Sequence, residues 1–192
     1  MSTERIVLHL MSAGPLLMRS SRLADPLEPI TQQLAAVTSK RMKTVADFKR
    51  IAELEWHGSL WLHDGKPCLT PEALEAAFIE GAKTRKRGRI ARAAFAVEAP
   101  AILEHDGPST LGAMWNDKDF RLRAMVRIRG DSMTVRTRPR FPRWSARVTA
   151  TFLTTMLNRD EVVEYFRVAG SLGIGDWRPK YGKFVVDEVS TK

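Results

Sequence analysis

The sequence predicts an α+β fold with an antiparallel sheet, and three observations predict it. A short β-rich apolar run lies near the N-terminus, a mostly helical middle follows, and the last third alternates strands with one capped helix. With 192 residues, 44% of them hydrophobic, the chain can bury a sizeable core, and its length favours one domain. We therefore expect a single domain over 1–192, with a core of about 1–20 and 120–192 and a mostly helical insertion of about 21–119 after the first strand.

The first strand and the first helices follow from periodicity. Residues 5–11 form an apolar run that ends at a turn containing Gly14. Apolar residues then recur every three or four positions over 30–54, and Pro29 suits the first position of a helix. Cations at 40–43 interrupt this pattern, so it fits one long helix or two.

The next elements are a hairpin and a helix with a strongly basic end. Asp64 and Gly65 between two short apolar runs predict a hairpin over 59–69, and Thr70 caps the helix that follows. This helix leads into residues 83–92, which contain six cations and no acid. Such a run is either a solvated helix end, favoured by the helix dipole, or a phosphate-binding segment. The residues assigned to phosphate contact here are Arg85, Lys86, Arg87 and Arg89.

A strand and a loop end the middle of the chain. Residues 93–103 predict a strand that Pro100 breaks. Residues 105–119 contain turn formers and show no periodicity. We expect a loop there, anchored to the core by Met114 and Trp115.

Two arginine-rich strands come next. Over 121–129 apolar residues alternate with arginines, and after a turn at Gly130 and Asp131 the alternation continues to residue 138. We expect a hairpin with one buried face and one face of guanidinium groups. The arginines assigned to that face as phosphate contacts are Arg123, Arg127, Arg129, Arg136 and Arg138.

The elements predicted at the C-terminal end complete an order of strands and helices that is typical of a known fold. Residues 139–144 predict a stiff connector and 145–153 a strand, and the capping box of Asn158 and Glu161 precedes a helix. The last apolar run, 183–189, predicts the final strand. One strand, a helical middle and then β, β, α and β match a split βαβ, or ferredoxin-like, core whose first crossover is enlarged by helices.

The most informative segment, residues 169–184, lies between that helix and the last strand. Glycines let a backbone approach a ligand closely, cations hold phosphates and aromatic rings stack on bases, and this segment holds all three. The alternative is a structural turn with solvated charges, in which Gly170 caps the helix. The spacing departs from the fingerprints of dinucleotide and P-loop sites, so we expect no nucleotide cofactor. The candidate nucleic-acid-binding residues are Gly173, Gly175, Trp177, Arg178, Lys180, Tyr181 and Lys183, and Trp144 is either a further stacking platform or a core residue.

The composition points to a polyanionic partner. The formal net charge is +9, from 31 Lys and Arg against 22 Asp and Glu, and phosphate contacts release counterions. No apolar stretch approaches the roughly 20 residues of a spanning helix and no signal-peptide pattern opens the chain, so we expect a cytoplasmic protein without membrane contact. The single cysteine, Cys68, excludes an internal disulfide and a cysteine-based zinc cluster. We expect no metal and no other cofactor.

The glycine-rich loop resembles a family signature. A segment of the type G-x-G-x-x-R-x-x-x-G-x-F, here Gly173, Gly175, Arg178, Gly182 and Phe184, joins the last helix to the last strand. It is similar to the loop of the RAMP superfamily of CRISPR-associated proteins, and most like the backbone subunits that coat a guide RNA. The resemblance implies an RRM-like core, subunits that repeat along a strand as a homo-oligomer or filament, and other subunits of a ribonucleoprotein complex as partners. A phage or mobile-element relative fits the same residues.

Together these patterns predict a protein that binds single-stranded RNA or DNA through phosphates, largely independently of sequence. One alternative is a phage structural or assembly protein whose arginines meet an acidic protein partner. A second is a metal-independent endoribonuclease, for which the resemblance points to a histidine near the first strand, here His9, whose imidazole we otherwise expect to be packed. Because no histidine pair has ligand spacing and no nucleophile elbow is present, we do not expect an enzyme.

Overall fold

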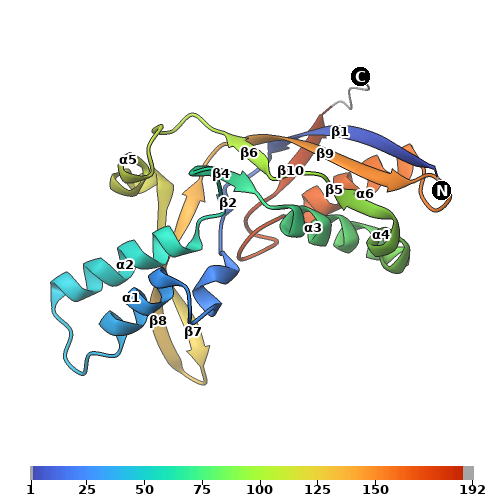
Figure 1. Ribbon diagram of the computed structural model, residues 1–192. Helices are drawn as coiled ribbons and strands as arrows, with labels where there is room; N and C mark the ends of the chain where they lie inside the picture. Colours follow the sequence, from blue (N-terminus) through green and yellow to red (C-terminus); the bar gives the residue numbers. More distant parts are fainter. Residues whose placement is uncertain (1, 188–192) are drawn as a thin grey trace. The chain divides into compact units, whose positions relative to one another are not determined.

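The computed structural model describes residues 2–187, with the side chain of Arg129 excepted, and the chain forms two compact units (Figure 1). Unit 1 consists of the chain up to residue 16, residues 61–106 and the chain from residue 142 on. Unit 2 consists of residues 17–60 and 107–141. These bounds differ from those of the predicted core and insertion, because residues 61–106 belong with the strands of unit 1 and residues 121–138 belong to unit 2.

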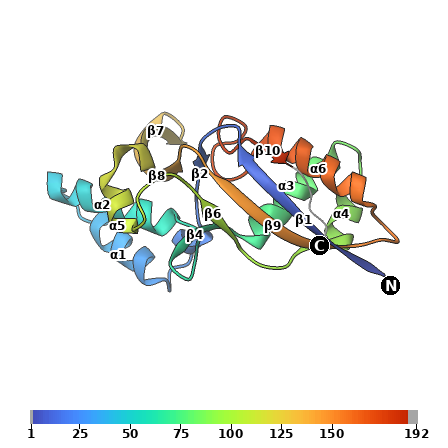
Figure 2. The same ribbon diagram turned by 90° about the horizontal axis from the view of Figure 1, so that it is seen from above.

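An antiparallel sheet is the centre of unit 1. Its strands are β1 (Thr3–Ser12), β3 (Leu62–His63), β4 (Lys66–Leu69), β5 (Phe95–Val97), β6 (Ala101–Glu104), β9 (Ser145–Leu153) and β10 (Phe184–Asp187). Strand β1 lies between β10 and β9, and it pairs with β9 along the whole length of that strand (Figure 2). The other edge of β9 pairs with β5 and β6, and β6 continues to β4 and β3.

Helices α3 (Pro71–Lys83), α4 (Gly88–Ala94) and α6 (Arg159–Leu172) lie on one side of this sheet (Figure 1). The period-two alternation of β1 buries Ile6, Leu8 and Leu10 on that side. The rings of Phe78 in α3 and Phe95 in β5 stack there with centroids 3.9 Å apart. The helices and the inner face of the sheet thus share one apolar core.

Unit 2 combines helices with a long hairpin. Its elements are η1 (Ser21–Ala24), α1 (Pro29–Thr38), α2 (Val45–Ser59), α5 (Leu111–Asn116), η2 (Lys118–Phe120), β7 (Arg121–Arg129) and β8 (Ser132–Phe141). Strand β8 lies between β7 and the two-residue strand β2 (Leu16–Leu17), and α2 packs on both α1 and β8. The fully buried Trp56 of α2 donates its Nε1–H to the carbonyl oxygen of Phe120 at 2.8 Å. This bond ties α2 to the base of the hairpin.

Short-range signals located most elements correctly. The α+β class and the antiparallel sheet are confirmed. The long helical pattern divides into α1 and α2, and Asp64 and Gly65 both have positive φ in the predicted hairpin turn. The side chains and backbones of Asn158 and Glu161 form the expected reciprocal capping box at the start of α6.

Two local predictions were wrong. Residues 111–116 form helix α5, capped by Thr110, where a loop was expected. Strand β8 runs through Pro139 to Phe141, so the predicted connector is shorter. Pairing with β7 extends β8 beyond what its local residue types indicate. Helix α6 continues to Leu172, which excludes the alternative in which Gly170 caps the helix.

Candidate nucleic-acid interface

The glycine-rich loop is anchored at both ends. The N–H of Ile174 donates to the carbonyl oxygen of Gly182 at 2.9 Å, which closes the loop on itself. The N–H of Gly182 in turn donates to the carbonyl oxygen of Pro15 at 2.8 Å, just after β1. Residues 175–181 therefore form a constrained turn rather than a free loop.

Close contacts within the loop explain two of its glycines. Gly173 and Gly182 are buried and have φ of 83° and 75°, a region that disfavours side chains. A Cβ at Gly173 would press on the carbonyl oxygen of Tyr181, and a Cβ at Gly182 would overlap that of Ile174. The space beside Gly173 is thus filled by the loop itself, whereas Gly175, with φ of 89°, is half-exposed.

The turn presents rings and cations together. The side chains of Trp177 and Tyr181 are half-exposed, and their ring centroids lie 6.2 Å apart at a tilt of 59°. The Nζ of Lys180 lies 5.7 Å from the Tyr181 centroid, and Arg178, Lys180 and Lys183 are exposed. A half-exposed ring beside a cation is suited to base stacking next to a phosphate.

A cationic pocket of about 480 Å³ lies at the junction of α3 and α4. Its described lining contains four cations and no acid, with Ile79 and Ala93 as apolar wall. The four cations are Lys83, Lys86, Arg89 and Arg92. Within residues 2–187, Lys83 alone among them forms an ion pair, with Glu80 at 2.5 Å. The other three charges are available to an anion.

The other two cations predicted to contact phosphates in residues 83–92, Arg85 and Arg87, bind other parts of the protein. Arg85 lies 3.7 Å from a carboxylate oxygen of Glu164 in α6. Arg87 donates to the carbonyl oxygen of Met156 at 2.9 Å and lies 3.3 Å from Glu161. Of the residues predicted here, Lys86 and Arg89 thus belong to the pocket, and Arg85 and Arg87 tie the turn to α6.

One carboxylate pairs with a cation of the pocket lining. The Lys83 ammonium, which donates to Glu80, lowers the pKa of Glu80, and Arg178 contributes to the same shift. The pocket and the glycine-rich loop both belong to unit 1.

The arginines of the β7–β8 hairpin do not form one face, contrary to the sequence prediction. Arg123 pairs with Thr137 and Ala124 pairs with Arg136, so Arg123 and Arg136 point to opposite faces. A bulge between Arg127 and Arg129 shifts the register by one residue. Arg129 pairs with Ser132 on the turn side of the bulge. If that register continued along the hairpin, Arg123 would lie opposite Arg138, on the common face that the sequence predicts.

Two hairpin arginines are engaged inside unit 2. Arg136 Nη1 lies 2.6 Å from Glu55 Oε1, and Glu55 Oε2 accepts the N–H of Thr137 at 2.8 Å. Glu55 is 2% exposed and Arg138 is 7% exposed. The ion pair of Glu55 with Arg136 stabilises the contact between α2 and β8. Burial leaves Arg138 little guanidinium surface for phosphates.

The other predicted residues divide between surface and core. Arg123 and Arg127 are exposed, and the side chain of Arg129 lies outside the described residues. Trp144 is buried and donates its Nε1–H to the carbonyl oxygen of Gly14 at 3.3 Å. Trp144 is therefore a core residue and not a stacking platform.

His9 lies on the outer face of the sheet, half-exposed rather than packed. The register places Arg147 of β9 and Asp187 of β10 directly opposite it on either side. The histidines His57 and His105 are partly buried, and this burial lowers their pKa. No group of three or more metal-binding side chains occurs within residues 2–187.

Sequence reasoning missed two residues of the pocket, Lys83 and Arg92. Together with Lys86 and Arg89 they recur at every third position, and this spacing was the signal that would have selected all four. Comparison with known proteins adds no further assignment, because no family model and no curated protein matches the chain. No helix in the described part of the chain has the length and apolar composition to cross a membrane.

Proposed function

We propose that this protein binds single-stranded RNA or DNA through phosphates, largely independently of base sequence. The observation that carries the proposal is the pocket at the α3–α4 junction. Three of its four cations, Lys86, Arg89 and Arg92, have no acidic partner among the described residues. Such cations bind backbone phosphates with release of counterions.

The turn at residues 175–181 supplies the second part of the proposed interface. Trp177 and Tyr181 keep accessible ring surface beside Arg178 and Lys180. A base stacked on either ring contributes about 1 to 3 kcal/mol, whatever its identity. Because the pocket and the loop both belong to unit 1, we propose that one strand places phosphates in the pocket and bases on the rings.

We further propose that unit 1 is a ferredoxin-like, RRM-like core of the RAMP type. Its strands β10, β1, β9 and β5 lie in the order of a split βαβ fold, with α3 ahead of β5 and α6 between β9 and β10. The loop that resembles the RAMP signature joins α6 to β10. This resemblance supports a cytoplasmic subunit that repeats along a strand, alone or with other subunits of a ribonucleoprotein complex.

The half-exposure of the loop rings favours nucleic acid over the acidic protein partner as the ligand of unit 1. An assembly protein that uses only its arginines needs no stacking surface, so its rings at positions 177 and 181 would pack inward. Both instead keep exposed area, next to cations for which the described part of the chain provides no acidic partner.

Endoribonuclease activity is a second candidate, favoured by the position of His9 between Arg147 and Asp187. An imidazole beside a carboxylate and a guanidinium can move a proton near a phosphate. The test is incubation of labelled RNA with the protein in a chelator, alongside His9→Ala. Uncut RNA, or equal cleavage by both proteins, removes this candidate.

Fluorescence anisotropy with labelled single-stranded oligonucleotides tests the binding proposal. We expect binding at low salt, with log K falling against log salt by about 0.7 for each phosphate contact. DNase and RNase sensitivity of copurifying nucleic acid would identify the natural strand. Absence of binding to both DNA and RNA at low salt would contradict the proposal.

A further inference from the structure

The exposed apolar side chains of unit 2 are not explained by nucleic-acid binding in unit 1. Unit 2 has fewer residues than unit 1 but holds more of the large apolar side chains that are exposed. They are Leu27, Met42, Val45, Phe48, Met125, Ile128, Met133 and Val135. Apolar residues that gather on a surface mark interaction sites.

Several of these side chains line a groove of about 620 Å³ within unit 2. Phe48 and Ile51 of α2 form one wall, and Met125, Met133 and Val135 of the hairpin form the other. The register pairs Met125 with Val135, so the hairpin residues lie on one face. Phe48 is 54% exposed and Met125 is 66% exposed. Phe48, which belongs to the helical apolar pattern over 30–54, thus lies in an open groove rather than in the core.

The rim of the groove is cationic. Lys43 and Arg123 line it, and its one acid among the described residues, Glu55, is already bound to Arg136 and to the backbone of Thr137. The Lys43 ammonium donates to the carbonyl oxygen of Lys40 at 2.7 Å, a neutral acceptor, so its charge is not compensated.

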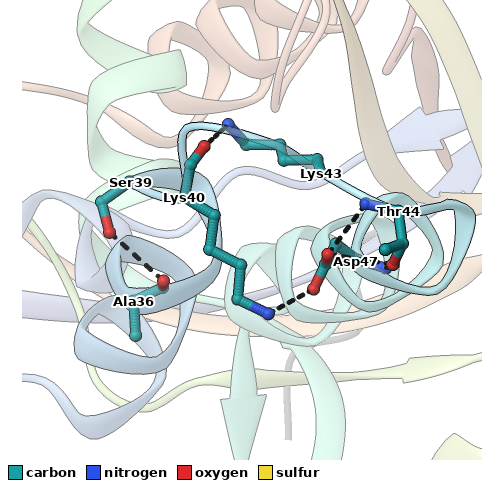
Figure 3. Close-up of polar contacts among 6 residues, drawn as sticks. All are labelled: Ala36, Ser39, Lys40, Lys43, Thr44 and Asp47. Carbon is teal, nitrogen blue, oxygen red and sulfur yellow. Dashed lines mark hydrogen bonds and ion pairs between the residues drawn. The ribbon is translucent and has the colours of Figure 1, made fainter.

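The connection that carries Lys43 is held in place (Figure 3). Asp47 accepts from Lys40 Nζ at 2.6 Å and from the N–H of Thr44 at 2.9 Å. Ser39 donates to the carbonyl oxygen of Ala36 at 3.2 Å. These bonds fix both ends of the turn between α1 and α2, so Lys43 is positioned at the groove before any ligand arrives.

We propose that this groove binds an acidic, amphipathic helix of a partner protein. The methionines Met125 and Met133 adapt to apolar side chains of a peptide, whereas base stacking needs ring platforms and the groove offers Phe48 alone. Apolar side chains from both α2 and the hairpin line the groove, which suits a helix with apolar residues at every third and fourth position. Carboxylates on its flanks pair with Lys43 and Arg123.

Selection from a display library of random peptides, each of about 16 residues or roughly 24 Å as a helix, tests this proposal on the full chain. We expect enriched peptides to carry net negative charge and apolar residues at helical spacing. Their affinity, measured by fluorescence anisotropy, should fall at least about tenfold on Met125→Glu and about threefold or more on Lys43→Gln.

The control variant is Ile128→Glu, which introduces the same glutamate in the same strand at an exposed residue outside the groove lining. It should leave peptide affinity unchanged. The proposal is overturned by failure to enrich peptides, by enrichment of neutral or basic ones, or by equal effects of the two glutamate variants. It is also overturned if Met125→Glu abolishes self-association or oligonucleotide binding, since the occupant is then a second copy or a nucleic acid.

Discussion

Two arginine-rich segments that look alike in the sequence differ in the structure. In residues 83–92 of unit 1, the cations Lys86 and Arg89 line a pocket without an acid in its described lining. In the hairpin of unit 2, α2 brings the buried Glu55 to Arg136, and a bulge turns the arginines of β8 away from those of β7. The number of cations in a segment therefore says less about phosphate binding than the position of acids on neighbouring elements.

Among substitutions that test the difference between residues 83–92 and the hairpin, the largest effect is expected for Glu55→Ala, on the free energy of unfolding. Glu55→Ala leaves Arg136 and the N–H of Thr137 without their acceptor, and should lower the free energy of unfolding of unit 2 by about 3 kcal/mol. Urea denaturation followed by tryptophan fluorescence measures this. The matched control is Glu164→Ala, which removes an exposed partner of Arg85 and should cost at most about 0.5 kcal/mol. Equal stability of the two variants would contradict the comparison.

A smaller effect is expected from the aromatic residues. Trp177→Ala should weaken oligonucleotide binding about tenfold without changing its salt dependence, because stacking releases no counterions. The control is Trp115→Ala in unit 2, where the Arg121 guanidinium already lies 4.7 Å from the ring centroid. Anisotropy titrations at two salt concentrations distinguish these outcomes, and an equal loss in both variants would count against the loop as the stacking site.

Removal of the acid that pairs with Lys83 should act in the opposite direction. Glu80→Gln frees the Lys83 ammonium and takes away one negative charge near Arg178, so oligonucleotide affinity should rise about twofold. Glu53→Gln, which removes the exposed partner of Arg50 in unit 2, should leave affinity unchanged. Weaker binding by Glu80→Gln would show that Glu80 organises the pocket rather than screening it.

The smallest effect concerns pH and the α1–α2 connection. The Lys40 ammonium, followed by the backbone and side chain of Thr44, lowers the pKa of Asp47 from 3.8 to about 2. Because the folded-state pKa is depressed, the stabilisation by Asp47 is complete above pH 3.8 and is lost as the pH falls toward 2. Acid titration of wild type and Asp47→Asn should show a stability difference that narrows over this window. A constant difference would mean that the ion pair does not stabilise unit 2.

Local signals in the sequence were sufficient to locate most helices and strands. They were insufficient to predict which charged side chains pair with other residues of the protein and which stay available to a ligand. The capping box at Asn158 and the turn at Asp64 depend on neighbours within four residues, so residue types alone located them. The alternation over 121–138 predicted two strands, but the bulge beside Arg127 is not encoded in that alternation. The partner of Arg136 comes from a helix 81 residues away, and the ring of Trp144 packs beside Gly14. Such long-range contacts decide which predicted site residues stay available.

The central claim is that the pocket at the α3–α4 junction, rather than basic charge in general, binds phosphates. The most direct measurement is the salt dependence of oligonucleotide affinity for Lys86→Ala/Arg89→Ala against Arg85→Ala/Arg127→Ala, two variants with the same loss of charge. The pocket variant should bind at least about tenfold more weakly, with a slope of log K against log salt that is smaller by about 1.4, and the control should change neither quantity appreciably. Equal loss of affinity and slope in both variants would contradict the claim.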